Sequence, residues 1–342
     1  MTISAIRKTL TATAVVTAVL AGSAACGTVE NLSAGQKLDR AFDKLGAERS
    51  LSFELDLDAD AKTLQALDAD AAPGEELPDK VAELLSGATI SLSVQSKKPL
   101  ADSGEKDFTT MGMKVSSTEG DLLEYRVVGD YTYFRADVAT LASAMGTPAP
   151  PADELPAEAG AFKKILEGEW VKVATKDLQQ DALAQGEPSP APTLDAKTQN
   201  KIVKALRGVI SREVEFKTAD EKDGTEHVTA TAPFRTLITG LFDGIRPLAK
   251  ELPAGLEFPT DKDFKDAPNV KVAADFALKN GALTEVSVDV AKLAENAKVK
   301  KLALVLRMSK GEKTTVPAGA TEVKLDELLE SVLGAGAGGA AL

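Results

Sequence analysis

The chain is poor in the residues that most enzymes use for chemistry. Its 342 residues include one cysteine, one histidine and one tryptophan. A single cysteine excludes a disulfide within the chain, and a single histidine without a cysteine cluster leaves too few ligands for a typical zinc site. His227 falls among threonines on the polar side of an expected strand, and no G-x-S-x-G motif accompanies it. We therefore expect no catalytic residue, no metal site and no cofactor.

Aromatic residues and positive charge are also scarce. Aromatics make up 4% of the chain, so an interior has to be built mainly from Leu, Val, Ile and Ala. The chain has 40 Lys and Arg against 52 Asp and Glu. The first 25 residues contain Arg7 and Lys8 and no acidic residue, so the remainder carries 38 minus 52, or −14. This balance argues against nucleic acid or an anionic membrane surface as the main partner.

The first 26 residues have the order of an export signal. Arg7 and Lys8 precede an apolar run over residues 10–21, which is too short to cross a ~30 Å hydrocarbon core as a stable helix. Small residues at 22–25 then lead to Cys26. A positive start, a short apolar middle and a small-residue end are typical of a secretory signal peptide.

Cys26 has two interpretations. Ser23-Ala24-Ala25-Cys26 resembles the lipobox of bacterial lipoproteins, in which the cysteine is acylated and the leader is cut directly before it. The alternative is a free thiol after an ordinary signal-peptidase site. We favour lipidation, because a lone cysteine in an exported chain lacks an intramolecular partner. The resemblance implies acyl chains such as palmitate on Cys26, which would anchor the protein at the extracytoplasmic face of the cell membrane.

The body of the chain alternates between apolar and polar residues over short segments, which predicts half-buried antiparallel strands. Residues 50–58 show the clearest alternation and follow a helix expected over 32–45, with Ser33 as a candidate N-cap. Asn280-Gly281 is the preferred pair for a type I′ turn and predicts a hairpin over 272–290. Further strands are expected at 90–94, 111–115, 123–127, 131–135, 169–173, 210–218, 225–231 and 302–308, with turns at Gly120-Asp121 and Gly129-Asp130.

The strongest amphipathic helix is expected over residues 234–250. Its apolar stripe is wide and is interrupted by Gly240 and Gly244. The helix could be an ordinary core helix, or part of its apolar face could line a cavity in which the two glycines leave room. Other helices are expected at 137–145, 161–166, 194–206 and 323–333.

The order of these elements resembles one known family. A helix at 32–45 leads into the strand at 50–58, and strand patterns follow at 127–133 and 169–173. Together with Cys26 they resemble the lipid-carrier lipoproteins of the LolA/LppX type, whose curved antiparallel half-barrel has helices packed on its concave face around an apolar cavity. The resemblance implies an α+β fold in which about ten or eleven strands form such a half-barrel. Heavy use of Ala, Gly and Val fits an actinobacterial lipoprotein.

This resemblance favours a membrane-anchored, non-catalytic protein that binds or carries lipid or lipoglycan acyl chains at the cell envelope. Burial of apolar surface at ~25 cal/mol per Å² could supply most of the affinity. The alternative is an anchored interaction module with a filled core, whose acidic surface binds a partner protein of the envelope. An enzyme ranks third, because no nucleophile–base pair can be assembled. The expected cavity residues are Leu55, Leu57, Leu92, Met113, Leu237, Leu241, Ile245 and Phe276.

The domain organisation follows from the same interpretation. Residues 1–25 are expected to be the signal peptide and 26–31 a lipidated linker. Residues 32–333 are expected to form a single lipid-carrier-like domain, and 334–342 a disordered tail. Two smaller domains divided near 180–195 remain the alternative.

Overall fold

The computed structural model describes residues 33–68, 76–147, 149, 151–155, 160–184, 196–221, 223–251, 259–260, 262–265, 267–297, 299 and 301–325. The chain forms two compact units, each assembled from segments that are distant in the sequence. One unit comprises residues 1–49, 96–107 and 190–293, and the other comprises 50–95, 108–189 and 294–342. We call them the four-strand unit and the eight-strand unit, after the strands found in the described residues. The number of independently folding domains stays a prediction.

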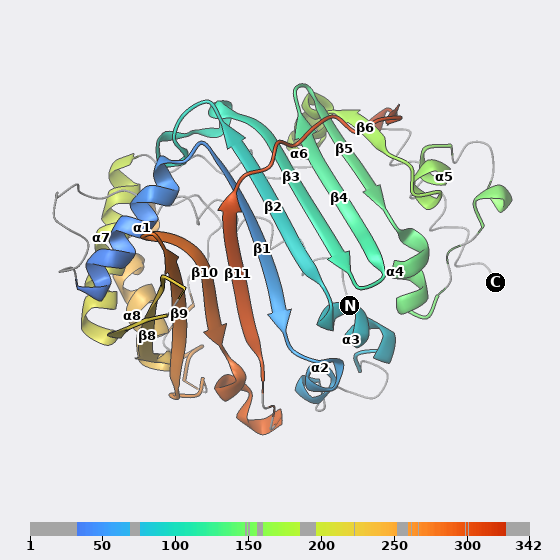
Figure 1. Ribbon diagram of the computed structural model, residues 1–342. Coiled ribbons are helices and arrows are strands. Elements are labelled where there is room, and N and C mark those ends of the chain that lie inside the picture. The colour runs from blue at the N-terminus through green and yellow to red at the C-terminus, as the bar shows by residue number, and fades with distance from the viewer. Residues whose placement is uncertain are drawn as a thin grey trace. The chain divides into compact units, whose positions relative to one another are not determined.

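The eight-strand unit is an open sheet with the strand order β12-β6-β5-β4-β3-β2-β1-β11 (Figure 1). The pairs β1–β2, β1–β11, β3–β4, β4–β5 and β5–β6 are antiparallel, whereas β12 runs parallel to β6. The strands are β1 (Ser50–Asp58), β2 (Thr89–Ser96), β3 (Phe108–Ser117), β4 (Gly120–Val128), β5 (Tyr131–Ala136), β6 (Val171–Ala174), β11 (Ala303–Lys310) and β12 (Thr321–Glu322).

Short helices accompany this sheet. Val171 and Val173 of β6 are fully buried, and they pack in one cluster with Ile165 of α5 and with Val323 and Leu325. This cluster is the best-buried part of the unit. The helices are α2 (Ala61–Leu67), α3 (Asp79–Ser86), α4 (Val138–Ala144), α5 (Gly160–Leu166) and α6 (Thr175–Ala184), with short 3-10 turns at η7 (Ala152–Glu154) and η10 (Ala291–Ala297).

Residues 311–320, which we call the strap, join β11 to β12 across the sheet (Figure 1). The strap is held by hydrogen bonds to successive strands. The Glu312 amide donates to Ser52 Oγ of β1 at 3.2 Å, and the Thr314 and Ser93 hydroxyls bond at 2.9 Å. Arg126 of β4 donates to the carbonyl of Thr315 at 3.1 Å. These contacts lie on the polar side of the strands, so the strap satisfies polar groups of that face.

Polar side chains between the strands complete this face. Asp56 on β1 accepts hydrogen bonds from Thr89 on β2 and from Arg307 on β11. Glu124 on β4 is only 5% exposed and pairs with both Arg126 and Arg135. A buried carboxylate is tolerated only when it is paired and hydrogen-bonded, and two arginines provide that here.

The four-strand unit has the strand order β10-β9-β8-β7, and all three pairs of neighbours are antiparallel. Asn280 and Gly281 have φ values of 53° and 68°, which confirms the type I′ hairpin expected from the sequence. Its strands are β7 (Glu215–Asp220), β8 (Thr225–Pro233), β9 (Lys271–Lys279) and β10 (Ala282–Asp289). Its helices are α1 (Ala34–Ala47), α7 (Ala196–Glu213) and α8 (Phe234–Ile245), with 3-10 turns at η5 (Leu100–Asp102), η6 (Glu105–Asp107) and η9 (Arg246–Glu251).

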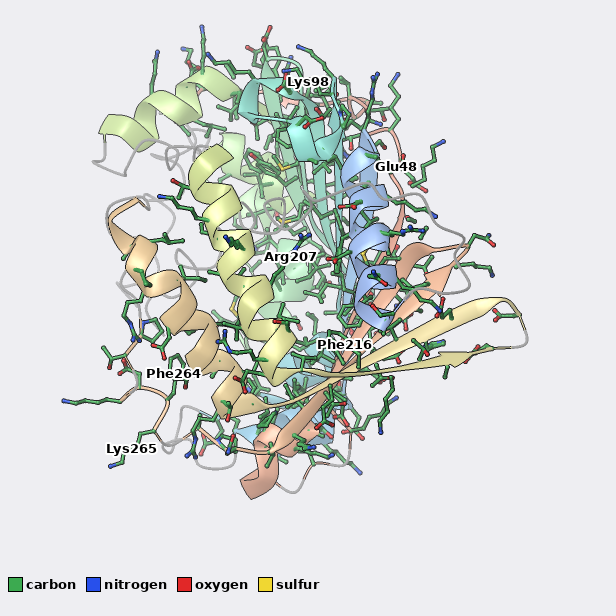
Figure 2. The ribbon with its side chains drawn as sticks, turned by 90° about the vertical axis from the view of Figure 1, so that its left-hand side faces the viewer. Glu48, Lys98, Arg207, Phe216, Phe264 and Lys265 are labelled. Atoms are coloured by element: carbon green, nitrogen blue, oxygen red, sulfur yellow. The ribbon has the colours of Figure 1, made fainter. Side chains whose placement is uncertain are left out.

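Helix α1 begins where the sequence predicts. Ser33 and Gln36 form a reciprocal capping box, which satisfies two amides of the first turn. The helix packs against β10, and its Phe42 meets Phe276 of β9 edge-on, with ring centroids 6.4 Å apart. Figure 2 shows α7 between α8 and α1. Three helices therefore accompany a four-strand sheet in this unit.

Three expectations about secondary structure are wrong in part. Residues 210–213 continue α7 instead of starting the strand expected at 210–218, because Val209 is buried and extends the helical spacing of Ile202. The turn before β4 lies at residues 118–119, and Gly120 already belongs to the strand. The helix expected at 323–333 does not begin at residue 323: residues 321–322 form β12, residues 323 and 324 are irregular, and residues 326–333 lie outside the described part of the chain.

The α+β class and the mostly antiparallel pairing agree with the sequence analysis. The described residues contain twelve strands, whereas about ten or eleven were expected. The difference includes the two-residue β12, which is too short to show alternation. The curved half-barrel stays a prediction.

Gly311 provides a test of the strap. A Cβ at this position would lie 2.6 Å from the Leu51 amide nitrogen and 2.8 Å from the Ser50 carbonyl carbon, and neither backbone atom can move easily. We expect Gly311→Ala to lower the free energy of unfolding by ~1–3 kcal/mol. Gly160→Ala in the same unit meets no atom within 4 Å and serves as the matched control. Equal urea-denaturation midpoints for the two variants would contradict the close packing of the strap.

Candidate functional site

The candidate site is the apolar face of β1, β2, β3, β4 and β11 in the eight-strand unit. The pairing brings apolar residues of neighbouring strands together: Phe53 lies opposite Leu92 and Met308, and Leu55 lies opposite Ile90 and Leu306. Residues that are directly opposite in an antiparallel pair share a face. The described members of this apolar sheet face are Leu51, Phe53, Leu55, Leu57, Ile90, Leu92, Val94, Met111, Met113, Val115, Leu123, Tyr125, Val127, Leu304, Leu306 and Met308.

Gly112 shows which face of β3 belongs to the site. A Cβ on Gly112 would meet the Ser93 hydroxyl and the side chain of Thr314, which belongs to the strap. Gly112 therefore points to the polar side of the sheet. Its neighbours Met111 and Met113 point to the opposite side, because successive side chains alternate along a strand.

This face is incompletely covered. Ile90 and Leu304 are 42% exposed and Met111 is 37% exposed, and each begins the apolar alternation of its strand. Leu55 and Leu92 are only half-buried. At the other end of the same sheet, Val171 and Val173 of β6 have no exposed surface. Among the described residues, this face is thus buried at β6, Leu51 and Met308, half-buried over most of β1–β3, and exposed at Ile90, Met111 and Leu304.

The apolar sheet face can bind a ligand by burial alone. Its described members are hydrocarbon or thioether side chains apart from Tyr125, so the face offers almost no group for acid–base or nucleophilic chemistry. Contiguous exposed apolar surface of this kind marks docking or ligand-binding sites in soluble proteins. The face can therefore hold an apolar molecule against the sheet.

Four of the eight expected cavity residues lie together on this face: Leu55, Leu57, Leu92 and Met113. The other four belong to the four-strand unit. Leu237, Leu241 and Ile245 are half-buried on α8, and Phe276 packs against Phe42 of α1. Whether all eight line one cavity stays a prediction. The sequence analysis did not select Ile90, Met111 and Leu304, although the same alternation identifies them.

Gly240 and Gly244 of α8 face α7. A Cβ on Gly240 would lie 3.0 Å from Val209 Cγ1, and one on Gly244 would lie 3.5 Å from Val209 Cγ2 and 3.7 Å from Ala205 Cβ. The two glycines therefore allow α7 and α8 to approach each other closely, as small residues do at helix crossings. The room they leave is occupied in part by Val209, which the sequence analysis did not anticipate.

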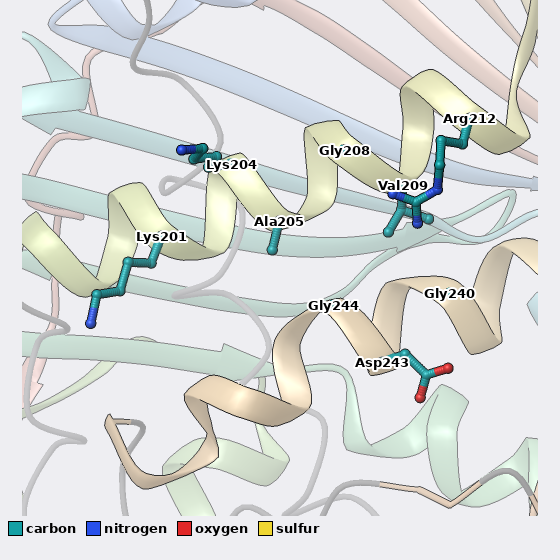
Figure 3. Close-up of a pocket in the computed structure, with 9 residues that line it drawn as sticks. All are labelled: Lys201, Lys204, Ala205, Gly208, Val209, Arg212, Gly240, Asp243 and Gly244. Carbon is teal, nitrogen blue, oxygen red and sulfur yellow. The ribbon is translucent and has the colours of Figure 1, made fainter.

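A groove of about 590 Å³ runs along this helix pair (Figure 3). Its lining residues are Lys201, Lys204, Ala205, Gly208, Val209 and Arg212 of α7 and Gly240, Asp243 and Gly244 of α8. None of the eight expected cavity residues lines this groove. Its cationic walls distinguish it chemically from the apolar sheet face.

His227 lies on β8 in a polar setting, as its threonine neighbours indicate. Its Nδ1–H donates to Asp275 on β9, and its Nε2 lies 3.4 Å from a Glu221 oxygen. The hydrogen bond to Asp275 raises the pKa of His227 above its ordinary value of 6.5, burial opposes this, and the charges of Asp275, Glu221 and Glu285 add to it. Thr229 also donates to Asp275, at 3.0 Å. His227 thus belongs to a cross-strand ion pair.

Trp170 packs on the polar side of the eight-strand unit. The guanidinium carbons of Arg126 and Arg135 lie 4.8 and 5.3 Å from its ring centre. These distances allow cation–π contacts, and the ring shields the Glu124 carboxylate that pairs with the same arginines.

The described residues contain no group of three His, Cys, Asp or Glu side chains arranged to hold a metal ion.

The predicted export signal, Cys26 and the linker 26–31 lie outside the described residues, as do the proline-rich stretch 186–193 and the tail 334–342. Within the part that the structure describes, no helix is both long and apolar enough to cross a membrane.

Comparison with known proteins does not identify a family. No protein-family model matches the chain, and no curated protein matches it. Among solved structures, the chain is similar to the crystal structure of the lipoprotein LppX from Mycobacterium tuberculosis, with 9% sequence identity and a TM-score of 0.31. The match covers 83% of this chain and 98% of that chain. At this TM-score the likeness carries no argument about function, so the proposals below depend on the residues of this chain.

The ion pair of His227 and Asp275 predicts a pH dependence of stability. Because the folded-state pKa of His227 is raised, its stabilising effect is complete below ~6.5 and is lost as pH rises through the raised value. The chain has one histidine, so a single imidazole C2-proton resonance reports the titration by NMR. We expect a midpoint above 6.5, which Asp275→Asn should lower. Glu215→Gln removes a charge on β7 and should leave the midpoint unchanged; an equal effect of both variants would contradict the pairing.

Proposed function

We propose that this protein is a membrane-anchored, non-catalytic lipoprotein whose apolar sheet face binds the acyl chains of a lipid or lipoglycan at the extracytoplasmic side of the cell membrane. The observation that supports this most directly is the exposure of Ile90, Met111 and Leu304 on an otherwise apolar face, whose central residues Leu55, Leu92 and Met113 are themselves only half-buried. A signal peptide ending at a lipobox-like Cys26 supports the location.

The energetics of burial are adequate for such binding. Each acyl CH₂ group removed from water contributes ~0.8 kcal/mol, so ten such groups contribute about 8 kcal/mol before the cost of immobilising the ligand. Micromolar affinity requires a net free energy of about 8 kcal/mol, so the immobilisation cost has to be offset by further CH₂ groups of a longer or second acyl chain. No ionic contact is needed, which agrees with the apolar composition of the face.

Two features favour a ligand over a filled core. On the polar side of the sheet, the strap and the ion pairs of Glu124 and Asp56 already provide partners for the polar groups, so this side does not need a ligand. The apolar side is only partly covered by described residues, and Met111 and Met113 add flexible thioether side chains that adapt to ligands of varied shape. We also propose that four residues of the four-strand unit contribute to the same site, and this part of the proposal is supported by the sequence alone. The four residues are Leu237, Leu241, Ile245 and Phe276.

An anchored interaction module is the alternative for this face, since a partner protein of the envelope could cover the same residues. The two functions differ in what accompanies the purified protein. A carrier retains lipid that organic solvent extracts, whereas an interaction module is recovered without lipid. The experiment below distinguishes them.

We expect residues 27–342, expressed in the presence of bacterial membranes, to retain about one lipid per chain in native mass spectrometry. The triple variant Ile90→Lys, Met111→Lys and Leu304→Lys should retain at least roughly tenfold less lipid, because each ammonium group would have to be desolvated against the acyl chain. All three side chains are already exposed, so the melting temperature should change little.

Val316→Lys is the matched control, because Val316 is 57% exposed but lies on the strap, outside the apolar sheet face. This variant should retain lipid at the wild-type level. Recovery of lipid-free wild-type protein, even after incubation with bacterial lipid extract, would overturn the carrier function and favour the interaction module.

Lipidation has a separate test at Cys26. Metabolic labelling with an alkyne analogue of palmitate should label the full-length protein, and Cys26→Ser should abolish the label and shift the protein from the membrane fraction to the soluble or unprocessed form. Ser23→Ala retains a small residue before the cysteine and serves as the control. Labelling that survives Cys26→Ser would exclude Cys26 as the acylated residue.

A further inference from the structure

The groove between α7 and α8 differs in charge from the rest of the protein. Helix α7 carries five Lys and Arg residues and one Glu over Ala196–Glu213, whereas the whole chain has a net charge of −12. Three of these cations, Lys201, Lys204 and Arg212, line the groove. A local excess of positive charge in an acidic chain indicates a binding surface for an anion.

The acidic residue of the groove does not neutralise this charge. Asp243 of α8 forms an ion pair with Arg246 at 2.5 Å, one turn further along the chain. Arg212 has its neighbour Glu213 at 3.9 Å, at the limit of an ion pair, and its side chain is 64% exposed. The groove is lined by three cations and one carboxylate, so its lining residues carry a net positive charge.

The geometry of the groove suits a phosphate group. Figure 3 shows Lys201 and Arg212 extending from α7 on the side that faces α8, with Ala205 between them along the helix. Gly208 and Ala205 provide small residues between the cations of α7 in this groove of about 590 Å³, whereas Gly240 and Gly244 are packed against Val209. A guanidinium group binds two phosphate oxygens at once, and ammonium groups add point charges. The floor of small residues leaves room for the anion between the cations.

The position of α7 relative to the expected anchor identifies the source of the phosphate. Arg207 of α7 lies 3.4 Å from Asp39 of α1, so the two helices are neighbours within the four-strand unit. Helix α1 begins at Ala34, eight residues after Cys26. Eight residues span at most about 28 Å when fully extended. If Cys26 is acylated, the tether thus holds α1 and its neighbour α7 close to the bilayer surface.

We propose that the groove lined by Lys201, Lys204 and Arg212 docks the four-strand unit on the membrane by binding phosphate groups of anionic phospholipids. The inference depends on the proposed function for the tether at Cys26, but it adds a second, non-covalent contact that orients the protein on the bilayer. Stable attachment of a lipidated protein commonly combines acyl chains with a basic surface. The whole-chain charge conceals this surface, because most of the acidic residues lie outside α7.

The test is flotation of residues 27–342, which lack the tether, with two kinds of vesicle at low salt. One contains phosphatidylcholine alone, and the other contains equal parts of phosphatidylcholine and phosphatidylglycerol. The wild-type chain should bind the anionic vesicles, and binding should weaken with added salt, since the contact is between exposed charges. The variant Lys201→Gln, Lys204→Gln and Arg212→Gln should bind about 100-fold more weakly, as each cation near an anionic surface contributes roughly a factor of five.

Two further variants make the result specific. The first is a triple variant that removes the same amount of charge from exposed positions of the same unit outside the groove: Lys217→Gln, Lys262→Gln and Lys265→Gln. This variant should retain binding to the anionic vesicles. Lys201→Arg, Lys204→Arg and Arg212→Lys keep the charge and should also retain it. Circular dichroism of all variants establishes that they are folded.

The outcomes separate this proposal from the proposed function. Equal loss in the groove variant and in the control variant, or no preference of the wild-type chain for anionic vesicles, overturns the docking site. Retention of lipid by the apolar sheet face is measured on the same proteins by native mass spectrometry. Loss of vesicle binding in the groove variant with unchanged lipid retention supports two distinct sites, and failure of lipid retention alone leaves the docking result intact.

Discussion

Strict alternation of apolar and polar residues along the strands determines how the eight-strand unit is built. Alternation gives a sheet with two chemically different faces, and each face has to be satisfied in its own way. The polar face is completed by the strap, by the paired carboxylates of Asp56 and Glu124 and by the stacking of two arginines on Trp170. The apolar face is packed with helices near β6 and is partly open along β1 and β2. The candidate site is therefore the unfilled part of a face that the sequence makes apolar throughout.

Local rules predict most of the elements. The alternation over Ser50–Asp58, the N-cap at Ser33 and the Asn280-Gly281 turn each depend on residues within one segment, and all three agree with the structure. Local sequence patterns of this kind predict secondary structure correctly because the residues that form the pattern are also the residues that determine the local conformation. The prediction for the end of α7 was wrong. The β-branched residues near position 210 favour a strand locally, whereas packing of Val209 against α8 extends the helix.

The site could be predicted only in part, because alternation does not distinguish a filled face from an open one. Leu55 and Val171 belong to similar patterns, yet one is half-buried and the other has no exposed surface. The difference depends on which helices pack on which strands, and that information is long-range. The groove also depends on long-range packing. The sequence shows the cations of α7, but only the close approach at Gly240 and Gly244 places them beside α8.

The pairing of β1 with β11 has a consequence for when the unit can fold. Leu51 lies opposite Lys310, so the first strand of the sheet finds this partner only after some 250 further residues have been made. The edge of β6 is completed by β12, which comes later still. Until both late strands arrive, the unit has unpaired strand edges and a high contact order, and such intermediates fold slowly. This topology delays folding of the unit until almost the whole chain has been synthesised, so the chain stays unfolded during the period in which the proposed export would take place.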